Sequence, residues 1–139
     1  MNLKNICLAC LLTLTLAACA LTRSDTNPWL DSRAGTASEN IGGKWTTAGG
    51  IGANWGEGNF IQDGSRFYGT LGAYYVDGSI NGEHLYLALS SGRKVYYTAR
   101  LRRAPDGSYG GKVVQGAIID HSNQADEGFQ LMTMRRIGK

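Results

Sequence analysis

The sequence predicts an all-β protein: an antiparallel up-and-down meander barrel of about eight strands, after an N-terminal signal segment and a flexible tether. Apolar residues alternate along five consecutive short segments between Gly58 and Leu101, and tight-turn residues separate the segments. Most of the 20 glycines lie between Gly42 and Gly128, which suits short twisted strands and tight turns. These observations favour a barrel, with a two-sheet sandwich as the alternative.

Residues 1–18 have the features of a targeting segment that is removed from the mature protein. Lys4 supplies a positive charge, and the apolar run from Ile6 to Leu16 is too short to span a bilayer. The run ends in Leu16-Ala17-Ala18-Cys19, in which small residues precede a cysteine. The alternative is an ordinary secretory signal followed by an incidental cysteine.

This four-residue box resembles the lipobox of bacterial lipoproteins. The resemblance implies lipidation of the Cys19 thiol, cleavage before Cys19 and acylation of the new amine. Several acyl chains would anchor the protein stably without a transmembrane helix. Ala20, where an Asp would signal retention elsewhere, implies the outer membrane of a Gram-negative cell. The membrane is therefore the first expected partner.

The cysteine count agrees with this interpretation. Cys7 and Cys10 would leave with the signal, and lipid would cap Cys19, the last of the three cysteines. The mature domain would then hold no disulfide in an oxidising compartment, so its core alone must stabilise it.

Residues 19–40 are interpreted as the lipidated cysteine and a flexible linker, and residues 41–139 as the β-barrel domain. The linker is rich in Ser, Thr, Asp, Asn and Gly and lacks periodicity. Trp29 and Leu30 within it could dock on the domain, touch lipid or remain free.

The charge of the chain argues against a polyanion as partner. The formal net charge is +3, and loss of Lys4 leaves about +2. The compartment also argues against nucleic acid. The basic residues concentrate at Arg100, Arg102 and Arg103, with Arg93 and Lys94 nearby. They predict either a solvated strand face or a contact with anionic head groups or glycans.

The strands are expected at intervals that turn residues define. The expected ranges are 43–47, 57–62, 65–71, 74–80, 83–90, 94–102, 108–119 and 128–137.

Two-residue turns at Asp63-Gly64, Gly72-Ala73 and Asn81-Gly82 place one set of side chains on one face. A three-residue loop, Ser91-Gly92-Arg93, would extend this face to Val95, Tyr97 and Ala99. In the last strand the choice between Phe129 with Leu131 and Met132 with Met134 stays open. The inward set that these three turns define is Phe60, Phe67, Leu71, Tyr74, Val76, Leu85, Leu87 and Leu89.

Gly43-Lys44-Trp45, followed by an antiparallel meander, resembles the first strand of the lipocalins and avidins, the calycin-type barrels. The resemblance implies that Trp45 packs across the closed end of the barrel. The strands are shorter than those of a lipocalin, and the polar biotin-binding set of avidins has no match in the chain.

The sequence favours no catalytic or metal chemistry. Asp120-His121-Ser122 cannot form a nucleophile–base–orienter chain along a strand, because successive side chains point to opposite faces. His84 has no histidine at ligand spacing, and no pair of carboxylates falls on the inward face of the meander. We expect no enzyme, no metal and no cofactor.

Two functions from different classes follow. The first is a non-enzymatic binding module for an apolar small ligand, a lipid or an envelope protein. Inward glycines at 58, 69, 78 and 111 could leave room for a ligand, although the aromatic side chains could equally fill the core. The candidate ligand-binding residues are Trp45, Trp55, Phe60, Phe67, Tyr74 and Tyr97.

The second is a solid-core structural or interaction lipoprotein that acts through its outer surface. One version resembles the small eight-stranded lysozyme-inhibitor lipoproteins in size and anchoring, although the disulfide that those proteins often carry is missing. Tyrosine and arginine are frequent in protein interfaces. The candidate interaction surface is Tyr68, Tyr75, Tyr86 and Tyr96 with Arg100.

Overall fold

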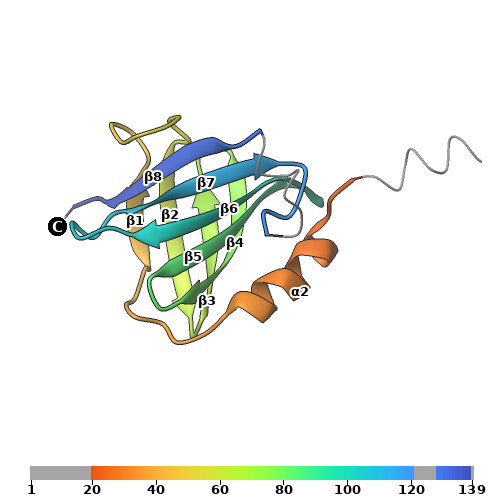
Figure 1. The fold of residues 1–139 in the computed structure, drawn as a ribbon, viewed down its shortest axis with the longest axis horizontal. Coiled ribbons are helices and arrows are strands. Elements are labelled where there is room, and N and C mark those ends of the chain that lie inside the picture. The colour runs from red at the N-terminus through yellow and green to blue at the C-terminus, as the bar shows by residue number, and fades with distance from the viewer. Residues whose placement is uncertain (1–19, 121–127, 139) are drawn as a thin grey trace, which may run out of the picture.

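A computed structural model describes residues 20–120 and 128–138, and shows a closed antiparallel barrel with one helix on its outside (Figure 1). Each strand pairs with the next in sequence, and β8 pairs back with β1. The predicted up-and-down barrel is therefore confirmed. The strands are β1 (Gly43–Thr46), β2 (Glu57–Asp63), β3 (Arg66–Leu71), β4 (Tyr74–Asn81), β5 (His84–Ser91), β6 (Lys94–Arg103), β7 (Tyr109–Gln115) and β8 (Gln130–Arg136).

The core lies inside the barrel and includes the whole predicted inward set. All eight predicted inward residues belong to it: seven are buried, and Tyr74 is half-buried against them. In β8 the inward residues are Met132 and Met134, whereas Phe129 and Leu131 are exposed. The strand expected over 108–119 is shorter in the structure, because β7 ends at Gln115. The alternation of side chains between the two faces, still seen at Val113 and Val114, stops there.

Two of the predicted turns differ from those in the structure by one position. The β2–β3 loop is Gly64-Ser65 and the β4–β5 loop is Gly82-Glu83, because Asp63 pairs with Arg66 and Asn81 with His84. Each of these one-position errors in the turn shifts the predicted pairing of the two strands by two residues. Since the side-chain period is also two, every residue keeps its predicted face. The Gly72-Ala73 turn is confirmed, with Leu71 opposite Tyr74.

The β5–β6 connection is also shorter than expected. Ser91 pairs with Lys94, so the loop is Gly92-Arg93, and a bulge follows because Leu89 pairs with Tyr97 while Ser90 pairs with Val95. Because β6 has one extra residue at the bulge, the side chains before the bulge point to the opposite face of the sheet from the predicted one. Val95 therefore lies outside the barrel, in an outer apolar cluster, and the prediction that it points inward is wrong.

The helix α2 (Arg23–Arg33) occupies the middle half of the segment predicted as a flexible linker. At its start, the carboxylate of Asp25 accepts hydrogen bonds from the backbone N–H and the hydroxyl of Thr22, both at 2.9 Å. These two bonds hold the pKa of Asp25 below its ordinary value. Thr22 and Asp25 together thus cap the helix and satisfy polar groups at its first turn.

The helix lies against β4, β5 and β6 rather than in solvent (Figure 1). Trp29 and Leu30 are buried, and the indole of Trp29 meets the ring of Tyr86 edge-on with centroids 6.0 Å apart. Arg23 adds a two-pronged ion pair to the carboxylate of Asp77, at 2.8 and 2.9 Å. The expectation of a flexible tether is therefore wrong for the described residues of this segment. The outer cluster under the helix comprises Trp29, Leu30, Tyr86, Ala88, Val95, Val114 and Ile119.

Candidate functional site

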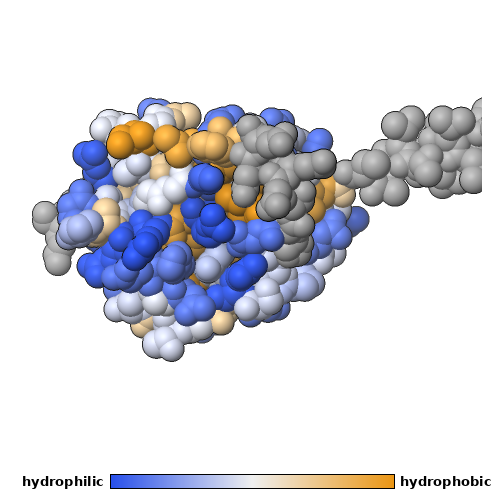
Figure 2. Space-filling model, in the orientation of Figure 1, coloured by the Kyte–Doolittle hydropathy of each residue, from blue (hydrophilic) through white to orange (hydrophobic). Residues whose placement is uncertain are grey.

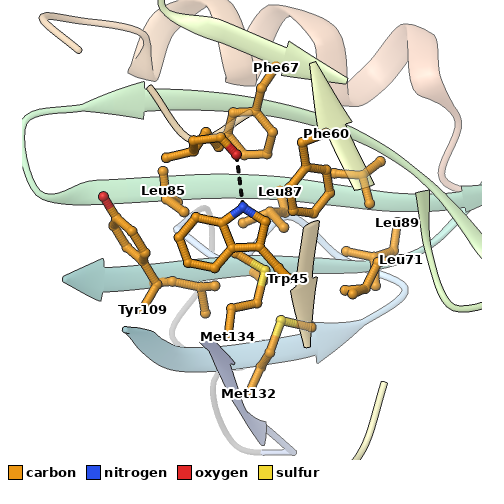
Figure 3. Packing of buried hydrophobic residues seen from close by; sticks show 14 of the residues in the cluster. Trp45, Phe60, Phe67, Leu71, Leu85, Leu87, Leu89, Tyr109, Met132 and Met134 are labelled. Atoms are coloured by element: carbon orange, nitrogen blue, oxygen red, sulfur yellow. Dashed lines mark hydrogen bonds between the residues drawn. The ribbon is translucent and has the colours of Figure 1, made fainter. Parts of the chain in front are cut away.

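The interior of the barrel is filled by its own side chains (Figure 3). Trp45, Phe60 and Phe67 are at most 2% exposed. The rings of Phe60 and Phe67 meet edge-on with centroids 5.5 Å apart. Three of the six predicted ligand-binding residues therefore form the centre of the core, packed on one another and on aliphatic neighbours.

The inward glycines leave no space. A Cβ atom on Gly78 would lie 2.1 Å from the ring of Phe67, so this ring occupies the volume that the missing side chain leaves. At Gly69 and Gly111 the backbone of the neighbouring strand comes equally close, at 1.9 and 2.0 Å from the position of a Cβ. These glycines allow close packing of ring and backbone.

The other three predicted ligand-binding residues close one end of the barrel. Trp55 meets Tyr97 edge-on at 4.9 Å, and Tyr97 meets Tyr74 in the same way at 5.7 Å. Burial and the neighbouring Tyr97 raise the pKa of Tyr74. The indole N–H of Trp55 is buried without a hydrogen-bond partner among the described residues. All three side chains pack against the core.

Trp45 lies in the core with its indole directed toward the start of β1. Its indole N–H donates a 2.8 Å hydrogen bond to the carbonyl of Ile41, drawn as the dashed line in Figure 3. The guanidinium of Arg136 lies 4.4 Å from the ring centroid. Nearby, the Tyr109 hydroxyl donates to Glu39 at 2.5 Å, and burial together with this bond raises the pKa of Tyr109.

Depressions that could take a small molecule lie on the outside. Their volumes are about 370 to 600 Å³, and none of them is lined by a residue of the central core. One is lined by Thr22, Arg23 and Arg93 near the start of α2. Another is lined by Glu39 and three arginines, together with residues 106–108 just before β7.

The predicted interaction surface divides into exposed and covered members. Tyr68 and Tyr75 are 42% and 61% exposed, but Tyr86 is buried under α2. Tyr96 is half-buried beneath the ammonium of Lys94, and Arg100 pairs with Asp120. The prediction that Tyr86 is exposed is wrong, because alternation within a strand does not reveal that a helix covers it.

Ile61 joins Tyr68 and Tyr75 although the sequence did not single it out. It is 75% exposed and lies directly opposite Tyr68, and Tyr75 lies opposite Thr70, the second residue after Tyr68 on β3. We call these three side chains, Ile61, Tyr68 and Tyr75, the outer stripe. Its alternation signal was visible in the sequence, since Ile61 follows the inward Phe60.

A second exposed apolar group lies over β8 and the loop before β2, along the upper edge of Figure 2. It consists of Ile51, which is 75% exposed, with Phe129 and Leu131. The loop is fixed here, because the Thr133 hydroxyl donates to the carbonyl of Ile51. Lys112 lies over the ring of Phe129 at 4.7 Å.

Within 20–120 and 128–138, no cluster of three His, Cys, Asp or Glu side chains could hold a metal ion. His84 stacks on Tyr86 at 6.4 Å. Asp120 accepts from Arg100 and lies 3.5 Å from Arg33, whereas His121 and Ser122 lie outside the described residues. No helix in the described part of the chain is both long and apolar enough to cross a bilayer.

The fold defines a class: a small closed antiparallel barrel of eight strands, compatible with a calycin-type fold. Comparison with protein-family models, with curated proteins and with solved structures finds no match to this chain.

Proposed function

We propose that this protein is a non-enzymatic lipoprotein of the bacterial outer membrane that binds an envelope protein through its outer surface. Cys19 carries the lipid anchor, as its position in a lipobox-like segment suggests. The outer stripe is the binding surface. The observation that carries this proposal is the combination of a filled interior with exposed aromatic and aliphatic side chains on an uncovered part of the barrel.

The outer stripe has the composition and order of a protein-binding surface. Tyrosine is enriched at interfaces because a large, stiff ring makes much contact at a low entropy cost. The guanidinium of Arg66 lies 5.5 Å from the ring centroid of Tyr68 and donates through Nε to the carbonyl of Gly78. These contacts hold the arginine, and the tyrosine against it, before a partner arrives. Less ordering entropy is then lost on binding.

An apolar ligand inside the barrel, the other function predicted from the sequence, has less support. Ligand pockets are concave spaces of several hundred Å³ lined by apolar side chains. Here the predicted lining residues contact one another across the interior. A ligand would require them to separate, and loss of this packing would cost several kcal/mol. Binding on the outside requires no such change.

The proposed interface is tested by site-specific photo-crosslinking in intact envelopes. A photoreactive phenylalanine derivative replaces Tyr75 in the outer stripe, and in a control replaces Arg102 on β6, whose side chain is 71% exposed. We expect one specific protein adduct from position 75 and none from position 102. The double variant Ile61→Ser with Tyr68→Ser should remove that adduct. Equal adducts from both positions, or no adduct at position 75, would contradict the proposal.

A further inference from the structure

The chain enters the fold at the β5–β6 turn, and it is bonded there from its first described residues. The backbone N–H of Val95 donates to the carbonyl of Leu21 at 2.9 Å, and the N–H of Arg23 donates to the carbonyl of Arg93 at 3.3 Å. Thr22 forms an antiparallel bridge with Lys94. Residues 21–23 therefore extend the sheet beside the start of β6, and the helix follows at once.

This arrangement leaves almost no connection between a lipid on Cys19 and the barrel. Two peptide units join Cys19 to Leu21, so their Cα atoms are at most about 8 Å apart. The flexible linker expected from the sequence, about 20 residues long, would instead have an end-to-end distance of about 25 Å. The two alternatives differ strongly in how freely the barrel could turn above a membrane.

The surface at this end suits a membrane interface. Arg93 and Lys94 are exposed, and the ammonium of Lys94 lies 4.8 Å from the ring centroid of Tyr96. Basic side chains attract anionic lipid head groups, and tyrosine favours the boundary between water and lipid. Of the acidic side chains beside them, Asp77 is paired with Arg23 and Asp25 accepts two bonds from Thr22.

We propose that the β5–β6 end of the barrel is held directly on the membrane surface, with Arg93 and Lys94 at the lipid head groups. The inference rests on the proposed lipid anchor at Cys19 and adds the orientation of the domain. The other end of β5, at the Gly82-Glu83 turn, then faces away from the membrane. The eight residues of β5 separate the two ends by about 25 Å, less the tilt of the strand.

The test compares labels at the two ends of this one strand. The cysteines of the sequence are Cys7, Cys10 and Cys19, so after processing and lipidation an introduced cysteine is the reactive thiol. Glu83→Cys places it at an exposed turn position just before β5, and Ser91→Cys places it at the exposed last residue of β5. A fluorophore is attached to each variant of the full lipidated protein on vesicles of phosphatidylethanolamine and phosphatidylglycerol that contain a head-group-labelled nitroxide lipid.

We expect at least threefold stronger quenching of the fluorophore at position 91 than at position 83. Equal quenching, or stronger quenching at 83, would overturn the inference. An insertion of about 20 Gly and Ser residues between Ala20 and Leu21 should remove most of the difference. If the difference in quenching persisted after the insertion, the short connection would not hold the domain in this orientation, and the inference would be wrong.

The same samples separate this inference from the proposed function. The intact mass of each labelled protein reports whether Cys19 carries lipid. A chain without lipid would overturn the anchor and the orientation together. A lipidated chain with equal quenching at both positions would leave the anchor standing and overturn the orientation alone.

Discussion

Gly78 and Phe67 show how single residues fill this small barrel. Gly78 lies inside β4 opposite Phe67 of β3, and the phenyl ring covers the glycine so closely that no Cβ fits. The side chain that fills the space therefore comes from the neighbouring strand. Such a contact is sensitive to one added methyl group, because tightly packed cores respond to volume changes of that size.

Gly78→Ala should lower the free energy of unfolding by about 1–3 kcal/mol, because the methyl group pushes the buried ring of Phe67 off its position. Chemical denaturation measures the change. Gly128→Ala is the control, since a Cβ there meets no atom of the described residues within 4 Å, and it should alter stability little. Adding Phe67→Leu to Gly78→Ala should recover part of the loss. A Gly78→Ala protein as stable as the parent would show that the ring is not confined.

At the scale of elements, the strands could be predicted from the sequence while α2 could not. The face of each inward residue between Phe60 and Leu89 follows from alternation, and the turn errors at Asp63 and Asn81 moved the pairing by two residues without changing faces. The helix lacks an apolar repeat, because Trp29 and Leu30 are adjacent and Pro28 precedes them. Its local signal was the cap formed by Thr22 and Asp25.

The exposed members of the candidate interaction surface could also be predicted from the sequence, whereas the covered member could not. Tyr68 and Tyr75 are exposed because they alternate with inward neighbours, which a sequence can show. Tyr86 is covered by α2, which lies more than 50 positions earlier in the chain. No local sequence pattern around Tyr86 indicates this contact. The bulge at Tyr96 likewise depends on how β5 and β6 pair rather than on either strand alone.

Leu30→Ala tests whether the helix is an integral part of the folded unit. Leu30 is fully buried between α2 and the sheet, so truncation should destabilise the protein by about 2–5 kcal/mol. The adjacent Asp31 is 68% exposed and pairs with Arg66, and Asp31→Ala should cost at most about 1 kcal/mol. Thermal or chemical unfolding compares the two. Equal stabilities would mean that the helix detaches independently of the barrel.

For the whole molecule, the closed sheet and the filled interior together support the proposal that the protein acts through its outer surface. The seam between β1 and β8 is short, with Trp45 opposite Arg136 and Thr46 opposite Arg135, yet it closes the sheet. Closure leaves no long edge strand among the described residues for another chain to pair with. Because side chains occupy the interior, both proposals place the interactions of this protein outside the barrel, at the outer stripe and at the point where the chain enters the fold.

Native mass spectrometry of the protein extracted from membranes tests most directly the central claim that a filled barrel is anchored by lipid at Cys19. We expect a chain that begins at Cys19, carries a diacylglyceryl group and one further acyl chain, and holds no other small molecule. The same mass should remain after denaturation, because every added group is covalent. An unmodified Cys19, or a bound ligand that denaturation releases, would contradict the claim.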